Sequence, residues 1–464
     1  MMARCSLRMR YKTSIVFFML FFIFKQALAG QDAQIRKNMH RVNVIYNYYV
    51  NKNITKLMQL SRSNDLVEKK HIKSLLYTLE WKFKDAVLYA QKCIDENDVT
   101  DYQKLLHYAC MIHLSRLYAY SGNIRSQYSV LLKMDKFYQE DMAHMRILNV
   151  DKYSSIVSRI TAKDIKSWPK THYSLINGNT YSKHDNGVIY VYINGVRVPL
   201  TIDTGSFGII INKINIQSII NKMKLKNLLA STSVSGPYGG RAKLNLHTAY
   251  NVSIGPLSIK NAYIYIMDSA NSFQDTAGTI GIDVISKLKH VTFTKKRILY
   301  SFLNTGSCNK LIFQPNFGVS YGLLIPLSTN YGSGLYFFDS GFDPYVTYKN
   351  KNNINSSILK KTSLAVFNSY ASKLILKHKI TVNKLNTMIN IEGFGFRSRL
   401  RHIKYFKYKI NNLSMHDDTY ATILNLNIDP VNYGGYGIIG MNTIKNTKLS
   451  ISIDFVGHRV CLLN

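Results

Sequence analysis

Two segments of the chain interrupt an apolar run with a carboxylate, a hydroxyl and a glycine. The first, VPLTIDTGSFGIII over 198–211, has Asp203-Thr204-Gly205 at its centre. The second, GLYFFDSGFDPYVTY over 334–348, has Asp339-Ser340-Gly341 in the same place. Taken singly, either tripeptide is typical of an Asp-Gly turn between strands. As a pair inside apolar runs, they indicate two carboxylates that a fold could bring together.

The surroundings of the two tripeptides repeat as well. Each tripeptide is followed by a glycine-rich segment, a strand-like segment and an apolar segment that contains Ile-Gly, in that order. These segments are 234–246, 252–259 and 278–293 after the first tripeptide, and 391–403, 408–415 and 437–452 after the second. The repeat predicts an internal duplication, and two lobes related by a pseudo-twofold axis would place their aspartates face to face.

Facing carboxylates have a definite chemistry. Two carboxylates about 4 Å apart repel by roughly 4 kcal/mol at an effective dielectric near 20. Such a pair holds one proton over a wide acidic range. One member can then activate a water as a base while the other protonates the substrate. We expect Asp203 and Asp339 to form this pair, with Thr204 and Ser340 bonding across the axis and the glycines allowing close approach.

The duplicated pattern resembles that of the aspartic peptidases over about 185–464, and each lobe is nearer in compactness to a retropepsin-like subunit than to half a pepsin. The resemblance implies peptide-bond hydrolysis by a water held between two aspartates, with no cofactor and no covalent intermediate. It implies catalytic Asp203 and Asp339, and flaps that close over an extended protein or peptide substrate. The implied supporting residues are Thr204, Gly205, Ser206, Ser340 and Gly341. The implied flap residues are Gly236, Tyr238, Gly239, Gly240, Gly393, Phe394 and Gly395.

The second lobe departs from the first at two positions. Phe342 stands where the first lobe has Ser206, so the two carboxylates can titrate differently. Asp283 follows the first Ile-Gly pair and Asn442 the second, without the arginine that retropepsin-like subunits usually have nearby. By itself, Asp283 is typical of a helix cap. These departures keep open an alternative of another class, an inactive exported binding or scaffold protein.

Composition narrows the class of protein. The chain has 464 residues, 46% hydrophobic and 19% charged, which is typical of several globular domains rather than of disorder. The net charge of +34 indicates either a solvated surface or attraction to an anionic surface such as lipid headgroups. The sequence contains no H-E-x-x-H, Walker or G-x-S-x-G motif and no C-x-x-C, so we expect no metal site.

The N-terminus predicts export. Residues 1–29 combine four basic residues before position 14, an apolar stretch over 14–24 and Ala-Leu-Ala at the end, as in a cleaved secretory signal. An uncleaved anchor is the alternative. A secreted or periplasmic protein would not be expected to bind nucleic acid. Four cysteines remain after cleavage, and the pairs Cys93–Cys110 and Cys308–Cys461 would each stay within one domain. Four buried free thiols are the alternative.

The remaining pattern predicts an α + β multidomain protein. We expect residues 30–166 to form an all-α domain, because 35–165 lacks proline and apolar residues from Leu75 to Ala90 recur at spacings of three and four, as on one face of an amphipathic helix. The helices resemble tetratricopeptide repeats or form an irregular bundle, and could bind a protein partner or brace the cleft. A Pro-, Gly- and Asn-containing linker would occupy 167–187. Mostly-β lobes of an acid-protease fold would occupy 188–305 and 306–464.

Overall fold

The computed structural model describes most of the chain beyond the predicted signal peptide. The described residues are 33–96, 100–142, 161–176, 180–184, 187–235, 241–267, 276–304, 308–315, 321–330, 332–341, 362–367, 371–372, 382–391, 396–403, 408–410, 413–414, 420–424, 437–441, 444 and 450–463. Residues 1–29 therefore lie outside the described part. Within it, no helix combines the length and apolar character needed to cross a membrane.

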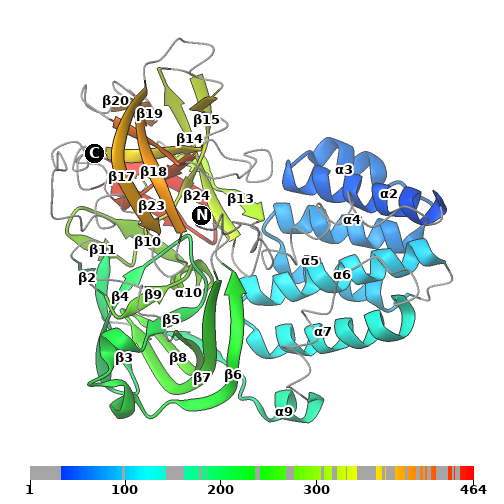
Figure 1. Ribbon diagram of the computed structural model, residues 1–464, viewed down its shortest axis with the longest axis horizontal. Coiled ribbons are helices and arrows are strands. Elements are labelled where there is room, and N and C mark those ends of the chain that lie inside the picture. Colours follow the sequence, from blue (N-terminus) through cyan, green and yellow to red (C-terminus); the bar gives the residue numbers. More distant parts are fainter. Residues whose placement is uncertain are drawn as a thin grey trace, which may run out of the picture.

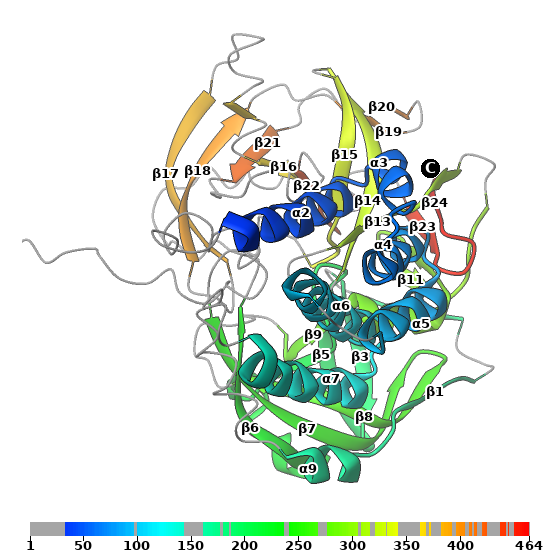
Figure 2. The ribbon, with the colours of Figure 1, turned by 90° about the vertical axis from the view of Figure 1, so that its right-hand side faces the viewer.

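The N-terminal part is helical and the C-terminal part is β-rich, which confirms the α + β prediction at this level (Figure 1). The helices are α2 (Ala33–Val50), α3 (Ile54–Leu60), α4 (Leu66–Leu79), α5 (Phe83–Ile94), α6 (Asp101–Tyr120), α7 (Ile124–Phe137) with the π-helical turn η2 (Tyr138–Met142), and α9 (Ala162–Ser167). Figures 1 and 2 show α4 to α7 stacked side by side against one flank of the β-rich part. We call Ala33–Ser167 the helical region.

Three tight turns of the same form join α2 to α3, α4 to α5 and α6 to α7. Their central residues Lys52, Trp81 and Gly122 have positive φ angles of 54°, 62° and 70°. In each turn the next backbone N–H donates to a tyrosine carbonyl five residues back, at 2.8 to 2.9 Å, as in a Schellman motif. The apolar run from Leu75 to Ala90 was predicted as one helix, and this prediction is wrong: the turn at Trp81 divides it between α4 and α5.

The first of three sheets holds the region around Asp203. Its strands are β1 (His172–Leu175), β3 (Val188–Ile193), β4 (Val196–Ile202), β5 (Ile209–Asn212), β6 (Lys226–Ser235), β7 (Arg241–Ile254), β8 (Leu257–Met267) and β9 (Gly278–Ile280). They are ordered β1-β8-β5-β9-β4-β3-β7-β6, and β7 also pairs with β8. The turns η5 (Ile214–Ile216) and η6 (Ile220–Met223) follow β5, and α10 (Ile282–Ile285) with η7 (Ser286–Leu288) follows β9.

A second sheet holds the region around Asp339. Its strands are β13 (Ile312–Pro315), β14 (Tyr321–Thr329), β15 (Gly332–Phe338), β16 (Thr362–Phe367), β17 (Val382–Ile391), β18 (Phe396–Ile403), β19 (Tyr408–Ile410), β20 (Leu413–Ser414), β21 (Tyr420–Leu424) and β22 (Gly437–Ile439). Nine of them are ordered β17-β18-β21-β16-β22-β15-β14-β19-β20, and β13 pairs with β14.

The pairing of strands in these two sheets repeats. In the first sheet β4 is parallel to β9, β9 is antiparallel to β5, and β5 is parallel to β8. In the second sheet β15 is parallel to β22, β22 is antiparallel to β16, and β16 is parallel to β21. An antiparallel hairpin then extends each sheet. In the first, β7 of the β6–β7 hairpin pairs with β8, and in the second, β18 of the β17–β18 hairpin pairs with β21. The strands that precede Asp203 and Asp339 therefore occupy equivalent places.

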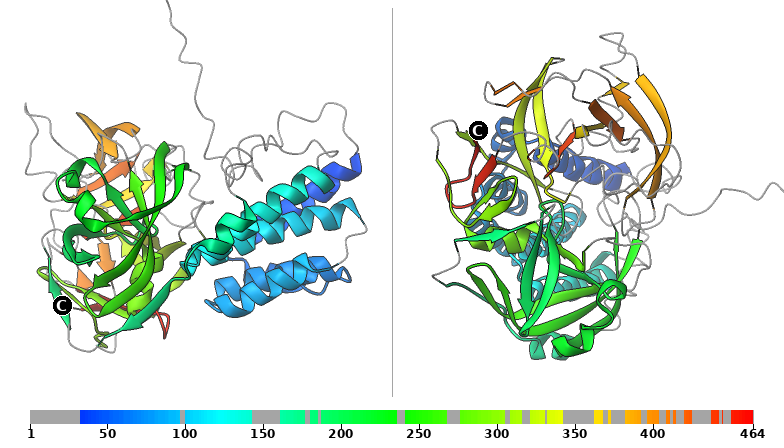
Figure 3. Two further views of the ribbon diagram at one scale, coloured as in Figure 1. Left: turned by 90° about the horizontal axis from the view of Figure 1, so that it is seen from below. Right: turned by 90° about the vertical axis from the view of Figure 1, so that its left-hand side faces the viewer.

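A third sheet contains strands from both halves of the β-rich part. It consists of β2 (Tyr181–Lys183), β10 (His290–Phe293), β11 (Arg297–Leu299), β12 (Cys308–Lys310), β23 (Ser450–Asp454) and β24 (Arg459–Leu463), ordered β12-β24-β23-β10-β11-β2. We call it the shared sheet, because a boundary at residue 305 would cut through it. Figure 3 shows the molecule from two further sides, with the C-terminal strands β23 and β24 in red.

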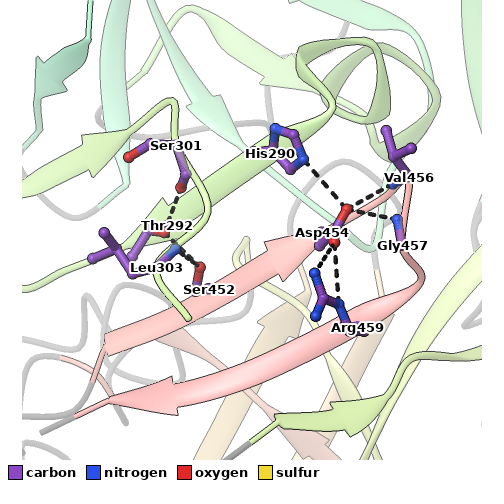
Figure 4. Close-up of polar contacts among 9 residues, drawn as sticks. All are labelled: His290, Thr292, Ser301, Leu303, Ser452, Asp454, Val456, Gly457 and Arg459. Carbon is purple, nitrogen blue, oxygen red and sulfur yellow. Dashed lines mark hydrogen bonds and ion pairs between the residues drawn. The ribbon is translucent and has the colours of Figure 1, made fainter. Parts of the chain in front are cut away.

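Side chains tie the two halves of the shared sheet together (Figure 4). Thr292 on β10 and Ser452 on β23 are 2.8 Å apart through their hydroxyl oxygens. Asp454 lies 3.4 Å from His290 and accepts hydrogen bonds from Arg459 at 2.9 Å and from the Gly457 N–H at 2.7 Å. Burial raises the pKa of Asp454, but the Gly457 and Arg459 hydrogen bonds outweigh it and hold this pKa below its usual value.

The expected linker at 167–187 contains two strands of the β-rich part. Its residues include β1, which pairs with β8, and β2, which pairs with β11. Both strands lie at the end of a sheet. Their side chains are therefore largely exposed, and their composition resembles that of a loop.

Two disulfides join neighbouring elements. Cys93 in α5 is bonded to Cys110 in α6. Cys308 in β12 is bonded to Cys461 in β24, its directly paired residue in the shared sheet. Each bond lies inside one part of the molecule, as the proposed pairing would require.

Candidate active site

The two aspartates follow equivalent strands. Asp203 comes directly after β4, and its backbone N–H donates to the Ile280 carbonyl on β9 at 3.0 Å. Asp339 comes directly after β15, and its N–H donates to the Ile439 carbonyl on β22 at 2.9 Å. Each aspartate thus makes one more hydrogen bond to the parallel neighbour of its strand, and its turn begins directly after this bond.

Reciprocal hydrogen bonds connect the two turns. The Thr204 N–H donates to the Ser340 hydroxyl at 3.0 Å, and the Ser340 N–H donates to the Thr204 hydroxyl at 2.9 Å. The Thr204 hydroxyl in turn donates to the Phe338 carbonyl, and the Ser340 hydroxyl to the Ile202 carbonyl, both at 2.8 Å. Thr204 and Ser340 are 0% and 2% exposed. Each hydroxyl therefore anchors the opposite strand at a buried position, where an unmade hydrogen bond would be costly.

The glycines bring each turn against the other aspartate. A Cβ built on Gly205 would lie 2.4 Å from Oδ2 of Asp339, and one on Gly341 would lie 2.4 Å from Cγ of Asp203. Gly205 also donates its N–H to Oδ1 of Asp203 at 2.8 Å, and Gly341 donates to Oδ1 of Asp339 at 3.0 Å. Only a residue without a side chain fits at either position.

The aspartates interact directly. Burial is the largest cause that raises the pKa of Asp203 well above its ordinary value, and the charge of Asp339 and a hydrogen bond with it raise this pKa further. The backbone N–H groups of Gly205 and Ser206 act in the opposite direction. The pair is therefore suited to hold one proton between two carboxyl groups.

The other expected site residues are only partly described. The Ser206 N–H donates to the Asp203 carbonyl at 3.1 Å, while its hydroxyl lies 3.4 Å from that of Thr279. Phe342 and Asn442 lie outside the described residues. So do the expected flap residues Gly236, Tyr238, Gly239, Gly240, Gly393, Phe394 and Gly395.

The hairpins that flank these flap positions are described. The pairing of β6 with β7 ends at Ser235 and Arg241, and that of β17 with β18 ends at Ile391 and Phe396. Figures 2 and 3 show the ends of these two hairpins approaching each other on one side of the β-rich part. They come from equivalent positions in the two sheets.

The sequence pattern did not show how Asp283 contributes to the geometry of the candidate site. It is not the helix cap, which is Gly281. Its carboxylate instead accepts a hydrogen bond from the N–H of Gly208, five residues after Asp203, at 2.6 Å. A run of Asp-Thr-Gly followed 80 residues later by Ile-Gly-x-Asp gives no local signal for this contact. Among the described residues, no three His, Cys, Asp or Glu side chains gather as metal ligands.

Comparisons with known proteins add little. No family model and no curated protein matches the chain significantly. Among solved structures, a retropepsin-like aspartic protease from Rickettsia conorii is similar, with 20% identity over 28% of this chain and 94% of that chain and a TM-score of 0.19. A TM-score this low carries no argument, so the functional conclusion depends on the geometry of the site.

Proposed function

We propose that this protein is an aspartic endopeptidase with two acid-protease lobes in one chain. One observation carries the proposal: two Asp-hydroxyl-Gly turns interlock reciprocally through Thr204 and Ser340 and press each glycine against the opposite aspartate. An isolated Asp-Gly turn needs no such partner. Holding two half-buried carboxyl groups against each other costs free energy, which a catalytic role explains.

In the proposed reaction the ionised member of the pair takes a proton from a water between Asp203 and Asp339. The water oxygen bonds to the carbonyl carbon of the peptide, while the protonated member donates its proton to the carbonyl oxygen. Collapse of this intermediate breaks the C–N bond as a proton passes to the leaving nitrogen. The products are a carboxylic acid and an amine, and the aspartates return to their starting state without cofactor or covalent intermediate.

The proposal is tested by cleavage of casein by the full mature chain between pH 3 and pH 8. We expect fragments to accumulate with an optimum below neutral pH. Absence of cleavage by wild-type protein at every pH would favour the inactive binding or scaffold protein instead.

The raised pKa of Asp203 predicts how rate and stability depend on pH. The rate should fall as the pH rises past the pKa at which the pair loses its shared proton. Because the folded-state pKa of Asp203 is raised, the folded protein keeps a proton that the unfolded chain has lost above about pH 4. Stability should therefore decline as the pH rises from there. We expect the Tm of Asp203→Asn to exceed that of wild type at pH 7 but not at pH 3. Equal Tm differences at both pH values would contradict this account.

Substitution of Gly205 by alanine should disrupt the pair. The added Cβ would overlap the Asp339 carboxyl, which would have to leave its place beside Asp203. We expect Gly205→Ala to lower kcat by about 10²-fold or more, since misplacement by 1 Å has this effect. Gly195→Ala is the control: no atom lies within 4 Å of its Cβ position, and its φ of 84° adds a backbone strain that Gly205 does not have. Equal activities of the two variants would refute the predicted contact.

The helical region resembles tetratricopeptide units in its three helix-turn-helix pairs, although positions 52, 81 and 122 give unequal repeats. We propose these units as the tetratricopeptide-like part of the protein. We also propose an exported chain, secreted or periplasmic, because residues 1–29 have the pattern of a signal peptide. The net charge of +34 falls to +29 without the five basic residues of 1–29, and would favour an anionic surface as a further partner.

A further inference from the structure

The loop that carries Asp203, here the Asp203 loop (203–208), is held from behind by the turn that begins α10. The Gly281 N–H donates to the Gly208 carbonyl at 2.6 Å, and the Ile282 N–H donates to the Ser206 carbonyl at 3.0 Å. A Cβ on Gly281 would lie 2.2 Å from Cα of Phe207, so the two backbones are in direct contact. Together with the Gly208–Asp283 bond, three hydrogen bonds fix the loop to this turn.

Of these three hydrogen bonds, only the one to Asp283 involves a side chain, and Asp283 lies beside the helical region. Asp283 is 3% exposed. Gly122, in the turn between α6 and α7, lies so close that an added Cβ would be 2.5 Å from the hydroxyl of Tyr173 and 3.7 Å from Oδ2 of Asp283. Gly122 and Ile124 line a small cavity together with Tyr173 and Asp283. Burial raises the pKa of Asp283 to about 6, against the Gly208 hydrogen bond and the charge of Lys287.

The turn itself does not require glycine. Lys52 and Trp81 occupy the same place in the two other turns, with φ angles of 54° and 62°. What distinguishes Gly122 is its surroundings, since an added Cβ would overlap the Tyr173 hydroxyl and would also touch Asp283. The glycine is therefore explained by the contact with the β-rich part and not by the helix-turn-helix form.

A cluster of aromatic side chains keeps the helical region in place beside this site. Trp81, Phe83 and Tyr120 come from the helical region, and Phe313 and Tyr321 come from the second sheet. Rings of the two groups are 5.2 to 6.2 Å apart. Burial raises the pKa of Tyr321, and Ser286, three residues after Asp283, acts against this shift. The helical region thus contacts both Asp283, which supports the Asp203 loop, and the second sheet.

We propose that the helical region helps to position the catalytic pair: by packing Gly122 against Asp283 and Tyr173 of β1, it holds Asp283, a positioning residue, against the Asp203 loop. This inference rests on the proposed peptidase function. The helical region would then act on the rate of the reaction without touching the substrate. Asp283 would act through Gly208, so its acceptor oxygen matters and its charge does not.

The test uses the full-length protein and three variants. Asp283→Ala removes the acceptor of the Gly208 N–H, whereas Asp283→Asn keeps an acceptor oxygen in the same place. Gly122→Leu puts a side chain into the contact, and Lys52→Leu is its matched control at the equivalent turn position. The kcat and KM for a casein-derived peptide are measured beside hydrogen exchange of the peptide segment 204–210.

We expect Asp283→Ala and Gly122→Leu to lower kcat by about 10-fold to 100-fold with little change in KM, and to speed exchange in 204–210. Asp283→Asn and Lys52→Leu should stay near wild type in both measurements. Equal behaviour of Asp283→Ala and Asp283→Asn, or wild-type kcat and exchange in Gly122→Leu, would overturn the inference. The exchange result does not need activity, so an inactive wild-type protein would refute the peptidase proposal while the positioning contact is still tested.

Discussion

Asparagine at position 203 or 339 is expected to lower kcat by at least about 10³-fold, in line with the size of general acid–base catalysis. Asparagine has nearly the shape of aspartate and keeps an oxygen that can accept the Gly205 or Gly341 N–H. It can neither take a proton from water nor donate one as an acid. The loss would therefore be chemical, and KM should change little.

Two controls separate this loss from misfolding. Asp95→Asn changes an exposed aspartate at the end of α5 and should leave cleavage unchanged. Circular dichroism and the Tm of the Asp203→Asn and Asp339→Asn proteins should show a folded chain. Cleavage that survives in a folded Asp203→Asn or Asp339→Asn protein would mean that another site, or a contaminating protease, is responsible.

The second large effect is expected at Trp81, the main contact between the helical region and the second sheet. Trp81 is 8% exposed, donates Nε1–H to the Leu311 carbonyl at 3.3 Å, and stacks on His458 with ring centroids 5.2 Å apart. Loss of a buried tryptophan side chain costs about 3–5 kcal/mol. We expect Trp81→Ala to lower the free energy of unfolding by this amount.

Urea denaturation followed by circular dichroism measures this change, and Trp81→Phe is the matched variant. Phenylalanine keeps a ring against Phe313 and Tyr321 but loses the hydrogen bond to Leu311, so a cost of about 1 kcal/mol from that bond is expected. Limited proteolysis should cut Trp81→Ala between the helical region and the sheets. A free energy of unfolding of Trp81→Ala within about 1 kcal/mol of wild type would contradict the role of Trp81.

The chemistry of the candidate site could be predicted because it is local in sequence. Asp203 with its hydroxyl and glycine neighbours, and the equivalent Asp339 segment, each lie within three residues at the end of an apolar strand. The repeat of surrounding landmarks then indicates that the two segments share one environment. No comparable local signal exists for Asp283, whose partner Gly208 is 75 residues away.

The sequence was less informative where an element is defined by distant partners. β1 and β2 are edge strands whose pairing with β8 and β11 cannot be read from their own mostly exposed residues. The shared sheet pairs β10 with β23 across more than 150 residues, which no periodicity records. The break between α4 and α5 was missed because Trp81, and not glycine or proline, takes the positive φ, and apolar spacing continues across it.

The central claim is that Asp203 and Asp339 work as one unit on one water, and a double-mutant cycle tests it most directly. The kcat for casein cleavage is compared among wild type, Asp203→Asn, Asp339→Asn and the double variant, all confirmed to be folded. Residues that act as a unit are strongly non-additive. We therefore predict that each single variant loses as much activity as the double variant. Losses that multiply in the double variant, or a single variant that retains substantial activity, would contradict the shared role of the two aspartates.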